Sequence, residues 1–126
     1  TARATLLAPV YFDFDRSDIR SSDHALVEQK ANILRANVPV LLRVEGNTDE
    51  RGSDEYNLAL GMRRAAQVRR ALMMQGVDSA RVAIISNGEE RSTCREPTEA
   101  CWSRDRRAEF VIVAGGERIT AVNHRP

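Results

Sequence analysis

Residues 40–76 constrain the fold most, because a strand pattern there runs directly into the pattern of a long helix. The stretch VLLRVEGNT alternates apolar and polar side chains and predicts a strand over about residues 40–48. A turn at DERG follows, and Ser53 is a favourable N-cap with two acidic residues behind it in the first turn. The helix is expected to end near Gly76.

Three more strands and one more helix are predicted around this unit. PVYFDFD alternates, with Val10, Phe12 and Phe14 on the side that can face a core, and predicts the first strand. The predicted ranges are a strand over 9–14, a helix over 23–37 capped by Ser21 or Ser22, and strands over about 81–87 and 106–114. The order βαβαββ predicts a two-layer α/β sandwich, with two main helices packed on one face of a mixed four-stranded sheet.

A single domain accounts for the chain. Its 126 residues, 42% of them hydrophobic, are enough for one core. We expect this domain over residues 9–114, after an N-terminal linker remnant over 1–8 and before a C-terminal tail over 115–126. Within it, EERSTCREPTEACWSRD is expected to be a long polar loop that contains about one turn of helix.

Composition argues against several classes of function. The 19 basic residues are balanced by 18 acidic ones and form no basic block, so nucleic-acid binding is not expected. No apolar run approaches the length of a membrane span, so a membrane would be reached only through an anchor outside this chain. Neither histidine stands in a zinc-like or triad-like pattern, and we expect no metal, cofactor or enzymatic activity.

The two cysteines, Cys94 and Cys101, lie in the polar loop. In the cytoplasm they would be free thiols, and in an oxidising compartment they could form a local disulfide. Composition alone leaves both possibilities open.

The long helix carries a candidate binding site. At 100° per residue, its sheet-facing side contains Gly61, Ala65, Val68 and Leu72, and the opposite side contains Arg63, Gln67 and Arg70. Asn57 and Arg64 fall on the sheet-facing side, two turns apart. An arginine in that position needs an anionic partner, because an unpaired buried charge costs several kcal/mol.

Asp49, just past the second strand, is the obvious partner of Arg64, and Asp15 at the end of the first strand lies at the same edge. One interpretation is an Asp49–Arg64 salt bridge that fixes the helix to the sheet. The other is a clamp held open for a zwitterion, in which Asp49 takes an ammonium and Arg64 takes a carboxylate in bidentate geometry.

Several segments also resemble a known family. YFDFDRSDI, EGNTDERGSDEYNLALGMRRAAQVRRAL, SNGEE and CWSRDRRAEF resemble the OmpA-like peptidoglycan-binding domain over about residues 9–114. TDERGSDEYNLALGMRRA is most similar to the peptidoglycan-associated lipoprotein branch. The resemblance implies the same βαβαββ sandwich and non-covalent binding of meso-diaminopimelate in peptidoglycan stem peptides.

The resemblance also assigns residues to the site. The family's ligand-binding positions fall on Asp49, Thr48, Asn57, Arg64, Asp15 and the backbone of Arg16. The chain departs from the family pattern at Asn47, where histidine is common, and at Asp105, where asparagine is usual. Asp105 is therefore expected to place a second carboxylate near the rim of the site.

The resemblance implies a cellular role as well. It places the domain at the periplasmic face of the outer membrane of a Gram-negative-type bacterium, where it would anchor that membrane to the cell wall. Expected partners are the peptidoglycan stem peptide and periplasmic proteins of the Tol system. In that compartment Cys94 and Cys101 are expected to form a disulfide. The alternative is a periplasmic protein-interaction module in which the Asp49–Arg64 pair is a structural salt bridge.

Overall fold

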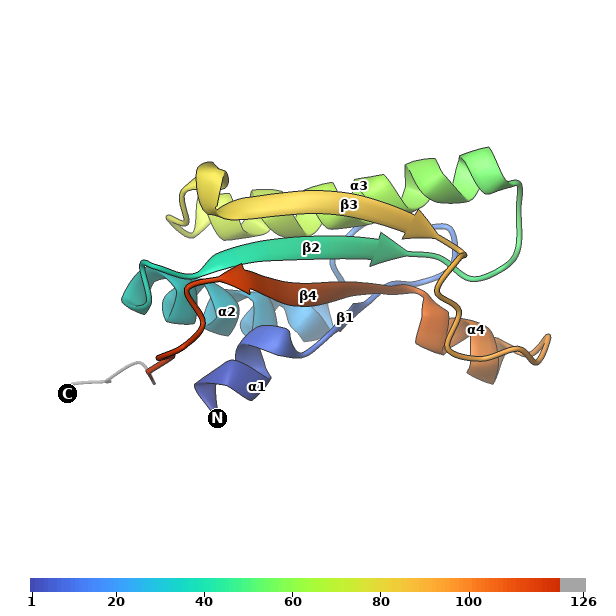
Figure 1. Cartoon of the computed structure of the whole chain (residues 1–126). Helices are drawn as coiled ribbons and strands as arrows, with labels where there is room; N and C mark the ends of the chain where they lie inside the picture. Colours follow the sequence, from blue (N-terminus) through green and yellow to red (C-terminus); the bar gives the residue numbers. More distant parts are fainter. Residues whose placement is uncertain (121–126) are drawn as a thin grey trace.

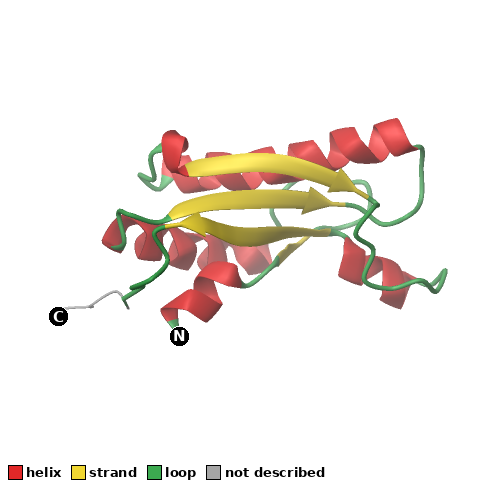
Figure 2. Cartoon of the chain, viewed as in Figure 1, coloured by secondary structure: helices red, strands yellow, loops and turns green. Residues whose placement is uncertain are grey.

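Four strands form one mixed sheet in the order β1-β4-β2-β3, in a computed structural model that describes residues 1–120 (Figure 1). The elements are α1 Ala2–Leu7, β1 Val10–Tyr11, α2 His24–Ala36, β2 Leu41–Asn47, α3 Asp54–Met74, β3 Val82–Gly88, α4 Glu99–Asp105 and β4 Arg107–Ala114. Helices α2 and α3 lie side by side on one face of the sheet (Figure 2). The predicted order of the four strands and two main helices and the two-layer architecture are confirmed, and α1 and α4 are additional helices.

The directions of the strands bring the ends of several helices and strands together at one end of the sheet. Strand β2 runs parallel to β3 and antiparallel to β4, and β4 pairs antiparallel with β1. The C-terminal ends of β2 and β3 therefore lie beside the start of β4. The N-terminus of α3 and the whole of α4 are at this same end (Figure 1).

Helix α3 begins where the sequence predicts. The Ser53 hydroxyl accepts a hydrogen bond from the backbone N–H of Tyr56, and Asp54 and Glu55 occupy the first turn. The side of α3 that was predicted to face the sheet is buried, since Gly61, Ala65, Val68 and Leu72 are all buried. The apolar face of the helix thus packs on the sheet as expected.

Two glycines let α3 lie directly on β2. A Cβ atom added at Gly46 would fall 1.7 Å from the Gly61 carbonyl oxygen, and one added at Gly61 would fall 2.8 Å from the Gly46 carbonyl oxygen. No side chain fits at either position, so backbone touches backbone. This contact fixes the height of the first half of α3 above the end of β2.

The expected linker over residues 1–8 needs correction. Residues 2–7 form helix α1, and Leu6 is completely buried in the core between α2 and the sheet. The hydrophobic pattern could not predict this helix, because α1 has only six residues and Leu6 is its one buried residue.

Lys30, the only lysine of the chain, holds α1 in place from α2. Its ammonium donates hydrogen bonds to the carbonyl oxygens of Thr5 at 3.0 Å, Leu6 at 2.8 Å and Ala8. It also lies 3.7 Å from the centroid of the Phe110 ring. The lysine therefore caps the C-terminal end of α1, where carbonyl groups lack helical partners.

The first strand is shorter than predicted, and Phe14 is not a core residue. Strand β1 contains only two residues, and Phe12 is buried while Phe14 is 54% exposed. The chain leaves the sheet after Tyr11 and turns at Asp15, whose φ of 56° is left-handed. Phe14 consequently lies at the end of the sheet where β2 ends, and not in the core under the sheet.

The expected tail over 115–126 is partly described. The Thr120 backbone N–H donates to the Asn37 side-chain oxygen at 2.9 Å, and Ile119 packs against the core. Residues 121–126 lie outside the described part of the chain. Within residues 1–120, no helix has the length and apolar character that crossing a membrane requires.

Replacing Gly61 with alanine should lower the free energy of unfolding by about 1–3 kcal/mol or more, because α3 would have to lift off β2. Urea denaturation measures the effect. The matched control is Met62→Ala on the neighbouring, 41% exposed position, which should stay within about 0.5 kcal/mol of the parent. Equal stability of the two variants would contradict the close backbone contact.

Lys30 should make the fold more stable as pH rises. Burial lowers the pKa of Lys30 from 10.5 to about 7, against a smaller raising effect from Asp23. Between these pKa values the unfolded chain binds a proton that the folded chain lacks, so the free energy of unfolding increases with pH.

Urea denaturation across this pH interval should show the rise in the parent and in Glu28→Gln, an exposed neighbour on α2. Lys30→Met should remove it. A parent profile without this rise would refute the assignment.

Candidate functional site

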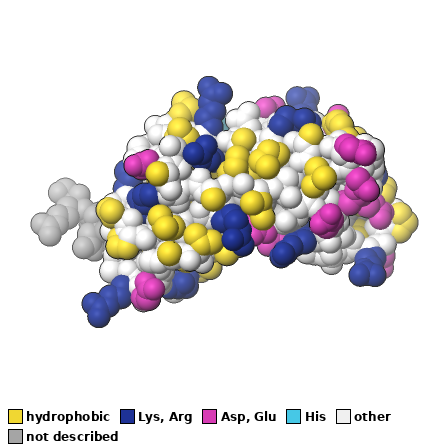
Figure 3. Space-filling model, turned by 45° about the horizontal axis from the view of Figure 1, so that its top comes forward, with side chains coloured by type: hydrophobic (Ala, Val, Ile, Leu, Met, Phe, Trp, Pro, Cys, Tyr) yellow, Lys and Arg dark blue, Asp and Glu magenta, His cyan; other side chains and the backbone are white. Residues whose placement is uncertain are grey.

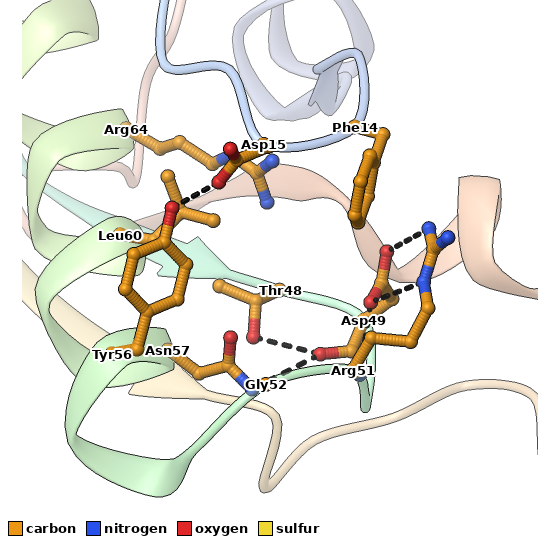
Figure 4. A pocket seen from close by; sticks show the side chains of 10 residues that line it. All are labelled: Phe14, Asp15, Thr48, Asp49, Arg51, Gly52, Tyr56, Asn57, Leu60 and Arg64. Atoms are coloured by element: carbon orange, nitrogen blue, oxygen red, sulfur yellow. Dashed lines mark hydrogen bonds and ion pairs between the residues drawn. The ribbon is translucent and has the colours of Figure 1, made fainter.

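A pocket of about 410 Å³ opens at the edge where β2 ends and α3 begins. Its lining comes from the loop after β1, the end of β2, the β2–α3 turn and the first turns of α3 (Figure 4). The lining residues are Phe14, Asp15, Thr48, Asp49, Arg51, Gly52, Tyr56, Asn57, Leu60 and Arg64. Five of the six predicted ligand-binding residues therefore meet in one pocket.

Arg64 is held by backbone, not by a carboxylate. Its guanidinium donates to the carbonyl oxygens of Arg16 at 2.8 Å, Asn47 at 2.9 Å and Asp13 at 3.1 Å. The side chain is fully buried, and within residues 1–120 no ion pair joins it to Asp49. The expected anionic partner of Arg64, and with it the Asp49–Arg64 structural salt bridge, is wrong.

Three carbonyl dipoles are enough to hold this charge in the interior. Burial lowers the pKa of Arg64 to about 10, with nearby Asp49 acting in the opposite direction, so the side chain stays cationic at neutral pH. A guanidinium has five N–H donors. Since three bonds are made within the described chain, two N–H groups remain for a ligand at the pocket wall.

Asp49 is paired with two other arginines. Its carboxylate accepts hydrogen bonds from Arg51 Nε at 3.1 Å, Arg51 Nη2 at 2.8 Å and the Arg51 backbone N–H at 3.0 Å. Arg106 Nη1 lies 3.6 Å away. Burial acts to raise the pKa of the Asp49 carboxyl, but Arg51 and Arg106 outweigh it and hold that pKa below its usual value.

Asp15 forms the opposite, exposed rim. Its carboxylate accepts a hydrogen bond from the Tyr56 hydroxyl, which comes from the first turn of α3 (Figure 4). This bond, with burial second, raises the pKa of Tyr56, so the hydroxyl remains a donor. The second carboxylate oxygen of Asp15 is available at the pocket mouth.

Of the other residues predicted for the site, two line the pocket and one contacts Arg64 from outside the lining. Thr48 and Asn57 line the pocket, and both donate to the Asp49 carbonyl oxygen, at 3.0 Å and 3.4 Å. Arg16 is outside the lining, and its carbonyl oxygen accepts a hydrogen bond from Arg64, while a contact of its backbone with a ligand stays a prediction.

The two departures from the family pattern are buried supports. Asn47 is 1% exposed and donates to the Glu45 and Arg107 carbonyl oxygens at 3.0 Å and 3.3 Å. Asp105 is also 1% exposed, and its carboxylate accepts hydrogen bonds from Ser92 and Thr93. The expected second carboxylate at the rim is therefore wrong, because Asp105 points into the loop that it stabilises.

The pocket suits a zwitterion on an aliphatic stem. Arg64 offers a cation to the pocket, and Asp15 and Asp49 add carboxylates to its lining (Figure 4). Leu60 with the rings of Phe14 and Tyr56 provides apolar surface between them. This arrangement offers complementary contacts to charged groups.

Comparison with known proteins identifies the fold family. Residues 11–106 match the model of the OmpA family. The chain belongs to this family. It is 43% identical over 100 residues to the peptidoglycan-associated lipoprotein of Pseudomonas putida, covering 79% of this chain and 60% of that protein. It is 43% identical over 99 residues to the protein of that name from Haemophilus influenzae, covering 79% and 65%.

Solved structures of the OmpA family agree with this assignment. The crystal structure of the peptidoglycan-associated lipoprotein from Burkholderia pseudomallei is 44% identical and superposes with a TM-score of 0.80, over 82% of this chain and 87% of that one. The C-terminal domain of Helicobacter pylori MotB shares the fold at 20% identity, with a TM-score of 0.77 over 83% of each chain.

Sequence reasoning missed four lining residues outright and misplaced a fifth. Arg51, Gly52, Tyr56 and Leu60 were not assigned to the site, and Phe14 was assigned to the core. Leu60 could have been found, because it lies one turn from both Tyr56 and Asn57 on α3. Arg51 sits in a turn, where no periodicity indicates the direction of a side chain.

Replacing Arg64 with alanine should destabilise the fold by about 2–5 kcal/mol, because three buried carbonyl groups lose their donor. Arg63→Ala, its exposed neighbour, should change stability by no more than about 0.5 kcal/mol. Thermal and urea unfolding of both variants provide the comparison. If Arg64→Ala unfolds like Arg63→Ala, the carbonyl contacts do not hold this part of the structure.

Proposed function

We propose that the domain binds peptidoglycan non-covalently through the meso-diaminopimelate of the stem peptide. The observation that carries the proposal is the pair of uncommitted N–H groups on buried Arg64, in a pocket that the carboxylates of Asp15 and Asp49 also line. Diaminopimelate ends its side chain in a carbon that bears both an ammonium and a carboxylate. One such end matches one cationic and one anionic wall.

Each charge of the ligand has an assigned partner. The side-chain carboxylate is bound by Arg64 through two N–H groups, as planar guanidinium groups bind carboxylates. The ammonium is bound on the side of Asp49 and Asp15, with Thr48 and Asn57 as polar neighbours. The methylene chain lies against Leu60 and the Phe14 ring.

The wider role follows from relatives that are longer than this chain. The chain spans about 60–65% of the length of the first relatives it matches. We propose that, within such a protein, the domain is a binding module, not an enzyme. It would lie at the periplasmic face of the outer membrane and anchor that membrane to the cell wall, with Tol-system proteins as further partners.

Ligand chemistry gives the sharpest test, because the protein stays unchanged. Calorimetric titration should show that a diaminopimelate stem peptide binds about 10–100-fold more tightly than its lysine analogue, which leaves Arg64 unpaired. A peptide with the side-chain carboxylate amidated keeps the shape and should behave like the lysine peptide. Equal affinities for the three peptides would remove Arg64 from recognition.

Two protein variants and one polymer control complete the experiment. Asp49→Ala should weaken binding by about 2–5 kcal/mol, and Arg64→Lys should also bind poorly because a point charge cannot make the two-pronged contact. Arg63→Ala should bind normally. A protein-interaction module would bind none of these peptides and would not be retained on insoluble peptidoglycan sacculi.

A further inference from the structure

Helix α4 brings two side chains against the arginines that flank Asp49. The guanidinium carbon of Arg51 lies 3.9 Å from the centroid of the Trp102 ring and 3.8 Å from the centroid of the Phe14 ring. Arg51 thus packs against two aromatic rings while it makes three hydrogen bonds to Asp49. Such stacking orients a guanidinium whose side chain would otherwise sample many rotamers.

The second contribution of α4 is a carboxylate. Glu99 pairs with Arg106 at 2.6 Å and lies 3.8 Å from Arg51. Arg106 is itself 7% exposed and places Nη1 3.6 Å from Asp49. Both cations beside Asp49 are therefore oriented by the same short helix.

Packing alone holds α4 weakly. The helix has seven residues, and residues 95–100 before and at its start are exposed. Isolated helices of this length are not stable in water. Its two buried residues are Cys101 and Asp105, and Cys101, 2% exposed, forms a disulfide with Cys94, which confirms the predicted bridge.

The start of the loop has an anchor of its own. Asp105 accepts hydrogen bonds from the Ser92 hydroxyl at 2.7 Å and the Thr93 backbone N–H at 2.6 Å. Breaking the disulfide would leave this point attached and release mainly residues 95–102. Reduction is thus expected to act on α4 without unfolding the domain.

We propose that the Cys94–Cys101 disulfide controls the binding pocket, because it keeps Trp102 stacked on Arg51 and thereby positions the carboxylate of Asp49. Trp102 is a positioning residue in this scheme and does not line the pocket. A dithiol reductant transfers two electrons and two protons to the bridge, which gives two cysteine thiols and the oxidised, cyclic disulfide of the reductant. The pocket then loses the Trp102 ring, so that Arg51 keeps only Phe14 of its two aromatic contacts and is oriented less firmly against Asp49.

The proposal rests on the proposed function for its ligand but has a readout that needs none. The first measurement is the affinity of the intact chain for the diaminopimelate stem peptide, with and without dithiothreitol. The second is an NMR titration of the Asp49 side-chain carboxyl in the absence of peptide. Reduction should weaken peptide binding about three- to thirty-fold, the loss expected for one cation–π contact. It should also move the Asp49 pKa up toward its ordinary value.

Variants separate the stack from the bridge. A Cys94→Ser, Cys101→Ala double variant should bind like the reduced protein and should not respond to dithiothreitol. Trp102→Ala should reproduce the reduced state in oxidised protein, whereas Trp102→Phe keeps an aromatic face on Arg51 and should restore most of the affinity and the lowered Asp49 pKa.

Two results would overturn the proposal. One is an unchanged affinity and an unchanged Asp49 pKa after complete reduction, checked by thiol alkylation and mass spectrometry. The other is a reduced protein that binds weakly while Trp102→Ala binds normally, since the effect would then bypass the stack. If the oxidised protein binds no diaminopimelate peptide, the proposed function fails, and the Asp49 titration alone decides for or against the positioning role.

Discussion

The buried guanidinium of Arg64 joins the parts from which the site is built. It bonds to carbonyl oxygens from two places in the loop after β1 and from the end of β2, while its own backbone belongs to α3. The contact between Gly46 and Gly61 lets that helix approach closely enough for the bonds to form. One cation therefore joins three segments around a pocket whose lining it shares.

This double role of Arg64 explains why the sequence predicts the position of the helix correctly but not the groups that bond to its arginine. The buried side of α3, its Ser53 cap and the inward position of Arg64 all follow from a period of 3.6 residues and from end preferences. The partner of Arg64 does not. Carbonyl oxygens belong to every residue, so a sequence contains no sign that distinguishes a site where three of them converge. Residue types could indicate only an oppositely charged side chain as the partner of Arg64, and they indicated Asp49.

The remaining differences lie where backbone direction changes. A left-handed Asp15 turns Phe14 from the predicted core position to the rim, and left-handed φ at a non-glycine residue has no reliable sequence signal. Helix α4 forms inside a segment whose polarity predicts a loop, and it is held by a disulfide, by Asp105 and by contacts with arginines. These contacts join side chains or backbone groups 7 to 12 residues apart, and no hydrophobic periodicity indicates them. Nor could periodicity reveal that Asn47 and Asp105 are internal supports.

Lys30 gives the domain a property of practical use in chemical labelling. It is the only side-chain amine of the protein, it is completely buried, and α1 covers it with three carbonyl groups. An acylating ester can reach that nitrogen only during moments when α1 has left the core. The rate of acylation at Lys30 therefore counts openings of a single helix, and it does so without any engineered probe.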